Sequence, residues 1–204
     1  MKPLRMARDV MLHPLEFFYD IQFVGRSKVV AAIALVLLTV AVRVLSLTIT
    51  GFSYQTREPY QISVVLQAVW IIVPWLTWAV ANWGVSTIVD GEGKFVDVLS
   101  GSAFAFIPYV VFMLPIAVLT NVLSLSESMI VSGLTAAVYL WVVMLVLMKV
   151  KVVHDFELGK VVWISLLTIA GMFVVWFIGL LVFGLVNQAF SFVIGLYKEL
   201  SFRW

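Results

Sequence analysis

Long apolar runs separated by short polar connections dominate the pattern of this chain. Five runs are long enough to cross a bilayer as helices, which takes about 20 mostly apolar residues each. A helix satisfies all its backbone hydrogen bonds internally, as the bilayer core requires. The pattern therefore predicts an all-α polytopic membrane protein, a bundle of about five transmembrane helices with amphipathic flanking segments. The expected spans are Lys28 to Thr50, Ile62 to Val89, Ser102 to Leu123, Met129 to Met148 and Val161 to Val186.

Two amphipathic segments flank these spans. In residues 14–21, one helical face carries Phe17, Phe18 and Ile21 and another carries Glu16 and Asp20. In residues 187–204, apolar side chains recur at helical spacing, which is typical of a helix lying in the membrane interface; a frayed tail is the alternative. The chain thus divides into a basic, amphipathic N-terminal segment (1–27), a five-span membrane domain (28–186) and an interfacial C-terminal tail (187–204).

Composition removes several functional classes. Apolar residues make up 63% of the chain, far above the roughly half found in soluble domains. Thirteen Lys and Arg against eleven Asp and Glu give too small an excess for a nucleic-acid binder, so no nucleic-acid partner is expected. The absence of cysteine excludes disulfides, thiolate metal ligands and thiol redox chemistry.

Basic residues flank the spans unequally, which predicts an orientation. Nine lie on the side of the N-terminus and three on the other: Lys2, Arg5, Arg8, Arg26, Lys28, Lys94, Lys149, Lys151 and Lys160 against Arg57, Lys198 and Arg203. Because basic residues are retained in the cytoplasm, we expect a cytoplasmic N-terminus and, after five crossings, a C-terminus outside.

Four polar side chains in or at the ends of the spans are candidate functional or structural residues. Arg43 lies inside the first span, where a charge costs about 2.5 to 3.5 kcal/mol at the centre. Two interpretations are open for this residue. Its side chain either snorkels to the headgroups or makes a structural contact, or it contacts a substrate. Gln67, Asn82 and Asn121 are expected to form interhelical hydrogen bonds, with a substrate path as the alternative.

Small residues predict close packing between helices. They lie on the fourth and fifth spans: Ser132, Gly133, Ala136, Ala137, Gly171 and Gly179. Prolines within spans predict kinks: Pro74, Pro108 and Pro115.

No constellation for bond chemistry emerges from the sequence. His13 and His154 are both expected at the cytoplasmic surface, and the segment His154-Asp155-Phe156-Glu157 reads as a solvated loop rather than a metal site. No P-loop or dinucleotide fingerprint occurs. We therefore assign no catalytic residue, cofactor or metal, and expect a protein that is not an enzyme.

The second connection resembles that of a known family. The run Asn82-Trp83, Asp90-Gly91-Glu92-Gly93-Lys94-Phe95 and Ala103-Phe104-Ala105-Phe106-Ile107-Pro108-Tyr109 is similar to the membrane domain of bacterial members of the Yip family. So is the entry segment, His13-Pro14 followed by Phe17-Phe18 and Ile21. The likeness covers about Pro14 to Val186.

The resemblance implies a five-helix membrane domain with a cytoplasmic N-terminus, in a bacterial plasma membrane. Eukaryotic relatives act in vesicle trafficking through small Ypt/Rab GTPases. This chain lacks their long N-terminal region and their Asp-Leu-Tyr-Gly-Pro element, so GTPase binding is not carried over. The expected function is interaction with other membrane proteins or organisation of membrane lipids. Self-association stays open, and the alternative is a small-solute channel, a transporter or an accessory subunit of a transport complex.

Overall fold

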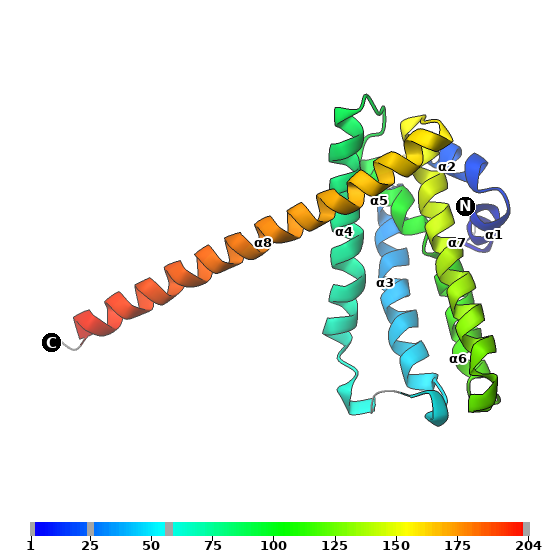
Figure 1. Cartoon of the computed structure of the whole chain (residues 1–204), viewed down its shortest axis with the longest axis horizontal. Helices are drawn as coiled ribbons and strands as arrows, with labels where there is room; N and C mark the ends of the chain where they lie inside the picture. The colour runs from blue at the N-terminus through cyan, green and yellow to red at the C-terminus, as the bar shows by residue number, and fades with distance from the viewer. Residues whose placement is uncertain (1–2, 24–26, 56–58, 202–204) are drawn as a thin grey trace.

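The computed structural model describes residues 3–23, 27–55 and 59–201, and within these ranges the chain forms helices and no strand (Figure 1). The helices in chain order are α1 Pro3–Leu12, α2 Pro14–Phe23, α3 Ser27–Ile49, α4 Val64–Ile88, α5 Phe95–Phe104, α6 Ile107–Leu119, α7 Ser128–His154 and α8 Leu158–Ser201. Short 3-10 turns, η1 Phe52–Tyr54, η2 Pro59–Gln61 and η3 Leu125–Glu127, lie at one end of the bundle.

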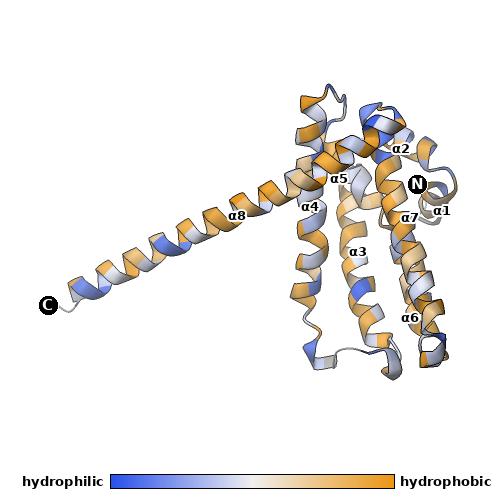
Figure 2. Cartoon of the chain, viewed as in Figure 1, coloured by the Kyte–Doolittle hydropathy of each residue, from blue (hydrophilic) through white to orange (hydrophobic). Residues whose placement is uncertain are grey.

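Five helical segments of the described chain are long and apolar enough to cross a membrane, which confirms the five expected spans. Figure 2 shows the hydrophobic colouring running along all of them. Four form an upright bundle and α8 leaves it obliquely (Figure 1). The spans are Lys28–Ile49, Val64–Ile88, Phe95–Leu119, Leu125–His154 and Leu158–Ser201.

The third span is two helices placed end to end. The break falls after Phe104, and α6 restarts with Pro108 in its first turn, where the missing backbone N–H of proline costs no helical hydrogen bond. Pro74 and Pro115 instead lie inside uninterrupted helices. Of the three prolines, Pro108 is therefore the one that coincides with a break.

The N-terminal segment folds back as a helical hairpin against one end of the bundle. On α2, Phe17, Phe18 and Ile21 are buried, as its pattern predicts. The ring of Phe17 meets that of Phe104 edge to face, with centroids 5.4 Å apart. The sequence did not predict α1 as a helix, although its Val10 is fully buried in the same core.

At the opposite end, the connection after α3 is fastened to the end of α6. The backbone N–H of Gly51 donates to Thr120 Oγ1 at 2.7 Å, and Asn121 Nδ2 donates to the Ile49 carbonyl at 2.8 Å. A Cβ on Gly51 would lie 2.5 Å from the carbonyl oxygen of Thr120. Only glycine allows the two backbones to approach this closely.

Helix α8 runs without interruption for 44 residues, about 66 Å at 1.5 Å per residue. Its buried residues, Val161, Ile164, Ser165 and Thr168, all lie near its start. From Phe173 to Ser201 every residue except Val175 is exposed. The boundary expected after Val186 is not a break in the helix, and residues 187–201 are helical rather than frayed.

Candidate functional site

The α4–α5 connection, which contains the run Asp90-Gly91-Glu92-Gly93, closes over the end of α7. Gly91 and Gly93 lie against the buried ring of His154, and a Cβ on Gly93 would be 2.6 Å from that ring. The chain turns at Asp90, whose φ is 58°. Only glycine at these two positions lets the connection pack this closely against His154. The motif therefore has a structural role at this end of the bundle.

His154 therefore corrects a sequence prediction. It was expected in a solvated loop, but it is 1% exposed and its ring stacks on Phe156 with centroids 5.4 Å apart. Neither ring nitrogen has a hydrogen-bond partner within the described chain. His13, by contrast, is exposed at the junction of α1 and α2, as expected.

A chain of hydrogen bonds crosses three helices just inside this end. Lys149 on α7 has no exposed surface, and its Nζ donates to Asn82 Oδ1 on α4 at 3.1 Å. Asn82 Nδ2 donates to Thr168 Oγ1 on α8 at 3.2 Å. Thr168 in turn donates to the carbonyl of Ile164 at 2.7 Å. Asn82 thus makes hydrogen bonds to both α7 and α8.

Gly101 on α5 provides the space that the Lys149 stem occupies. A Cβ there would lie 2.9 Å from Lys149 Cγ. Further buried hydroxyls without a described partner belong to the same helices: Ser86, Ser100 and Ser165. A polar layer therefore lies within an otherwise apolar bundle.

A second buried charge lies beside this layer. Lys28 at the start of α3 pairs with Asp97 on α5, and Lys28 Nζ also donates to the Gln22 carbonyl at 3.1 Å. Both side chains are about nine-tenths buried. The Gln22 amide donates in turn to the carbonyl of Val152 at 3.4 Å. The pair joins α3 to α5, and Gln22 joins the N-terminal hairpin to Lys28 and to α7.

Sequence reasoning missed these two sites because it treated Lys28 and Lys149 as flanking charges in water. A signal was present in the spacing. Asn82 and Ser86 are four residues apart on α4, and Ser165 and Thr168 are three apart on α8, so each pair shares one helical face. Polar residues repeated at that spacing inside an apolar helix indicate a buried polar layer.

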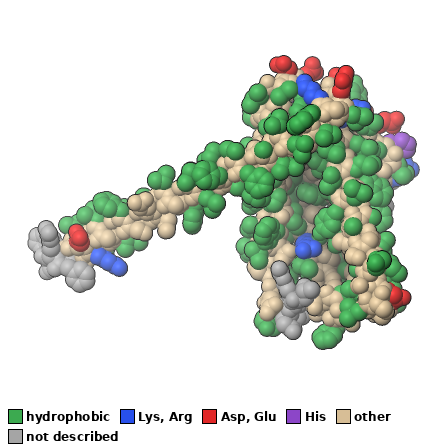
Figure 3. All heavy atoms as spheres, in the orientation of Figure 1, with side chains coloured by type: hydrophobic (Ala, Val, Ile, Leu, Met, Phe, Trp, Pro, Cys, Tyr) green, Lys and Arg blue, Asp and Glu red, His purple; other side chains and the backbone are tan. Residues whose placement is uncertain are grey.

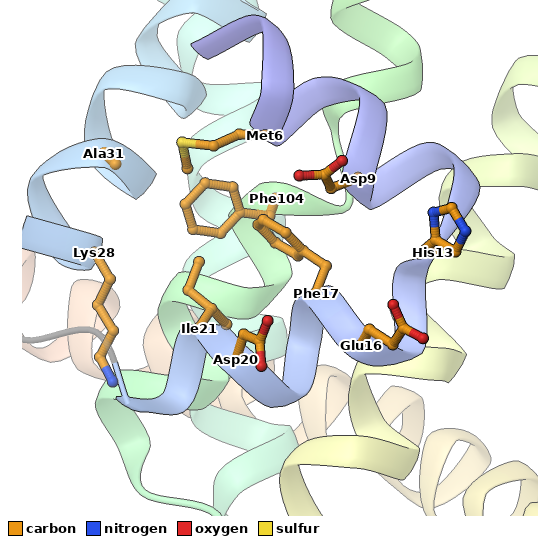
Figure 4. Close-up of a pocket in the computed structure, with 10 residues that line it drawn as sticks. All are labelled: Met6, Asp9, His13, Glu16, Phe17, Asp20, Ile21, Lys28, Ala31 and Phe104. Carbon is orange, nitrogen blue, oxygen red and sulfur yellow. The ribbon is translucent and has the colours of Figure 1, made fainter. Parts of the chain in front are cut away.

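A pocket of about 450 Å³ opens between α1, α2 and α3. Figure 4 shows Met6, Phe17, Ile21 and Phe104 gathered at its centre and three carboxylates around it, from Asp9, Glu16 and Asp20. Its interior is therefore apolar, and its rim carries these three carboxylates together with His13 and Lys28. The described residues contain no group of three His, Asp or Glu that could hold a metal ion.

The remaining polar candidates lie toward the other end. Arg43 is half-buried on α3, and its Nε donates to Gln67 Oε1 on α4 at 3.3 Å. Asn121 is exposed and donates to the Ile49 carbonyl. The structure thus brings Arg43 and Gln67 together and keeps both away from Asn82.

The small residues fall into two groups. Gly171 packs on α4, where a Cβ would lie 3.5 Å from the Ala81 methyl. The others are exposed, and Gly133 and Gly179 have no neighbour within 4 Å of a built Cβ. The exposed set on α7, which we call the α7 small face, consists of Ser132, Gly133, Ala136 and Ala137.

Comparison with known proteins agrees with this architecture. The sequence matches the Yip1 domain over residues 8–179, which takes in α2 to α7 and the packed part of α8. No curated protein and no solved structure matches the chain. Because the matched region covers most of the chain and includes the glycine turn over His154, this integral membrane protein belongs to the Yip1 domain family.

Proposed function

We propose that this protein is a non-enzymatic membrane component that acts by associating with other integral membrane proteins. The observation that supports this is the α7 small face, which points away from the chain's own helices. Small residues let helix backbones approach closely in a bilayer, where dispersion contacts and interhelical hydrogen bonds drive association. The exposed length of α8 offers a second apolar surface, one formed mainly by large side chains.

Site-specific photo-crosslinking in native membranes tests this proposal. A photoreactive amino acid at Ala137 should give a discrete adduct with another membrane protein or with a second copy. The same amino acid at Val30, which is 69% exposed on α3 and outside the small face, serves as the matched control. The proposal fails if Ala137 gives no adduct beyond that at Val30 and the purified protein stays monomeric without altering liposome shape.

We also propose that the N-terminus faces the cytoplasm of a bacterial plasma membrane and the C-terminus lies outside. The excess of basic residues at the hairpin end supports this orientation. Because the chain has no cysteine, single cysteines report on sidedness cleanly. His13→Cys should resist an impermeant thiol reagent in intact cells and Ser126→Cys should react. The reverse labelling pattern would invert the orientation.

The second candidate is a small-solute channel or an accessory subunit of a transport complex. It is favoured by a cavity of about 420 Å³ beside Arg43. Reconstituted protein should then conduct a solute, and Arg43→Ala should abolish the flux while expression is unchanged. A flux that is the same in the variant, or absent under every gradient tested, excludes this role.

A further inference from the structure

The cavity beside Arg43 is a groove between α4 and α7. Gln67, Trp70, Ile71 and Pro74 of α4 form one wall, Tyr139 and Val142 of α7 form the other, and its remaining lining is Thr39, Arg43, Phe106 and Tyr109. In Figure 3 a basic patch stands among hydrophobic side chains in the lower half of the bundle. Figure 2 shows the matching hydrophilic segment on α3.

Two sources of positive potential meet at one end of this groove. Arg43 is bonded to Gln67, which lies in the first turn of α4. The N-terminus of a helix carries a partial positive charge and so favours anions; in α4 the N–H of Leu66 is already capped by Ser63 Oγ. Within the described chain, no carboxylate forms an ion pair with Arg43. The described neighbours offer it a neutral amide oxygen and the hydroxyl of Tyr109, with which it interacts electrostatically.

The depth of this site matches the membrane interface. Arg43 lies six residues before the end of α3, about 9 Å along the helix axis, and its side chain reaches the first turn of α4. Trp70, six residues into α4, is exposed beside the groove, and such an aromatic residue is typical of the headgroup level. From Gln67 to Pro74 the α4 wall continues about 10 Å deeper, into apolar surroundings.

We propose that this groove binds an anionic phospholipid of the leaflet nearest η1, η2 and η3. Its acidic headgroup contacts Arg43 and the N-terminus of α4. An acyl chain lies in the deeper part, between Pro74 and Val142. A lipid fits better than a small anion because the polar and apolar parts of the groove follow one another along the membrane normal.

Native mass spectrometry of the full-length protein in mild detergent tests this assignment. We would titrate phosphatidylglycerol and phosphatidylcholine with identical acyl chains, and inorganic phosphate in a parallel thermal-stability assay. Wild type should retain phosphatidylglycerol preferentially. Arg43→Gln should weaken this retention by about tenfold, as expected for loss of a charge-assisted contact. Lys198→Gln, which removes an exposed cation on α8, should leave it within about twofold.

A second variant separates a lipid from a free anion. Val142→Phe fills the apolar part of the groove without touching Arg43, and should reduce phosphatidylglycerol retention by a similar factor. This arm also decides the matter if Arg43→Gln fails to fold. Equal binding of both lipids, unchanged retention in Val142→Phe, or stabilisation by inorganic phosphate alone to the same extent would overturn the proposal.

Discussion

The hydrogen bond between Lys149 and Asn82 predicts that mutations at these positions are not additive. Asn82 Oδ1, 3.1 Å from Lys149 Nζ, is the acceptor that the described chain offers this buried amino group. A hydrogen bond from a charged donor contributes about 1.5 to 3 kcal/mol. The bond from Asn82 to Thr168 adds about 0.6 kcal/mol, the average in a membrane. Asn82→Ala should therefore lower the free energy of unfolding by about 2 to 3.5 kcal/mol.

Replacing Lys149 by methionine should change the free-energy cost of Asn82→Ala. Methionine fills the same space beside Gly101 without a polar group, and substitutions of buried charges by apolar side chains are often neutral or stabilising. In the Lys149→Met background, Asn82→Ala loses only the bond to Thr168, about 0.6 kcal/mol. The coupling energy between the two positions should be about 1.5 to 3 kcal/mol.

The coupling is measured by unfolding in mixed micelles of increasing dodecyl sulfate content, followed by the fluorescence of the eight tryptophans. Wild type, both single variants and the double variant complete the cycle. Ser132→Ala, at an exposed position on α7, is the control and should change stability by less than about 0.5 kcal/mol. If the two single costs add within about 0.5 kcal/mol, Asn82 does not compensate the buried lysine and the reasoning is refuted.

Three further substitutions test other contacts by the same unfolding measurement. Gly51→Ala should destabilise by more than about 2 kcal/mol, because the new Cβ meets the Thr120 carbonyl at 2.5 Å; a neutral result would show that the two backbones can separate. Gly133→Ala should instead stabilise by about 0.5 to 1 kcal/mol, since its Cβ enters open space in a helix; a loss of stability in the isolated protein would contradict that placement. Asp97→Asn should cost about 3 kcal/mol or more, because it leaves Lys28 buried without its carboxylate, and a cost below about 1 kcal/mol would mean that the pair is effectively solvated.

The spans were predictable because hydropathy reports directly on the length of helix that lipid can surround. The third span shows where this signal fails. It begins at Phe95 rather than at the expected Ser102, and the first turns of α5 contain Asp97, Ser100 and Gly101. Those residues lower the local hydropathy, yet protein surrounds them instead of lipid. A hydropathy profile does not distinguish these two environments.

The burial of Lys149 and His154 depends on contacts between residues far apart in the sequence. Lys149 requires the space left by Gly101, and His154 requires the space left by Gly91 and Gly93. Each glycine alone reads as a turn or a packing residue. What was predictable was the pairing of Asn82 with another helix, because a buried amide must find a partner in a bilayer.

The length of α8 determines how far this protein extends in the plane of the membrane. Between Lys160 and Lys198 lie 37 consecutive uncharged residues, about 55 Å of helix, against a hydrocarbon core of about 30 Å. A straight helix that keeps all of them in the core inclines until its two ends are separated by about 45 Å in the plane of the bilayer. A chain of 204 residues would then contact neighbours several lipid diameters beyond its own bundle. In a thicker membrane the helix would tilt less, and the in-plane distance between its ends would be shorter.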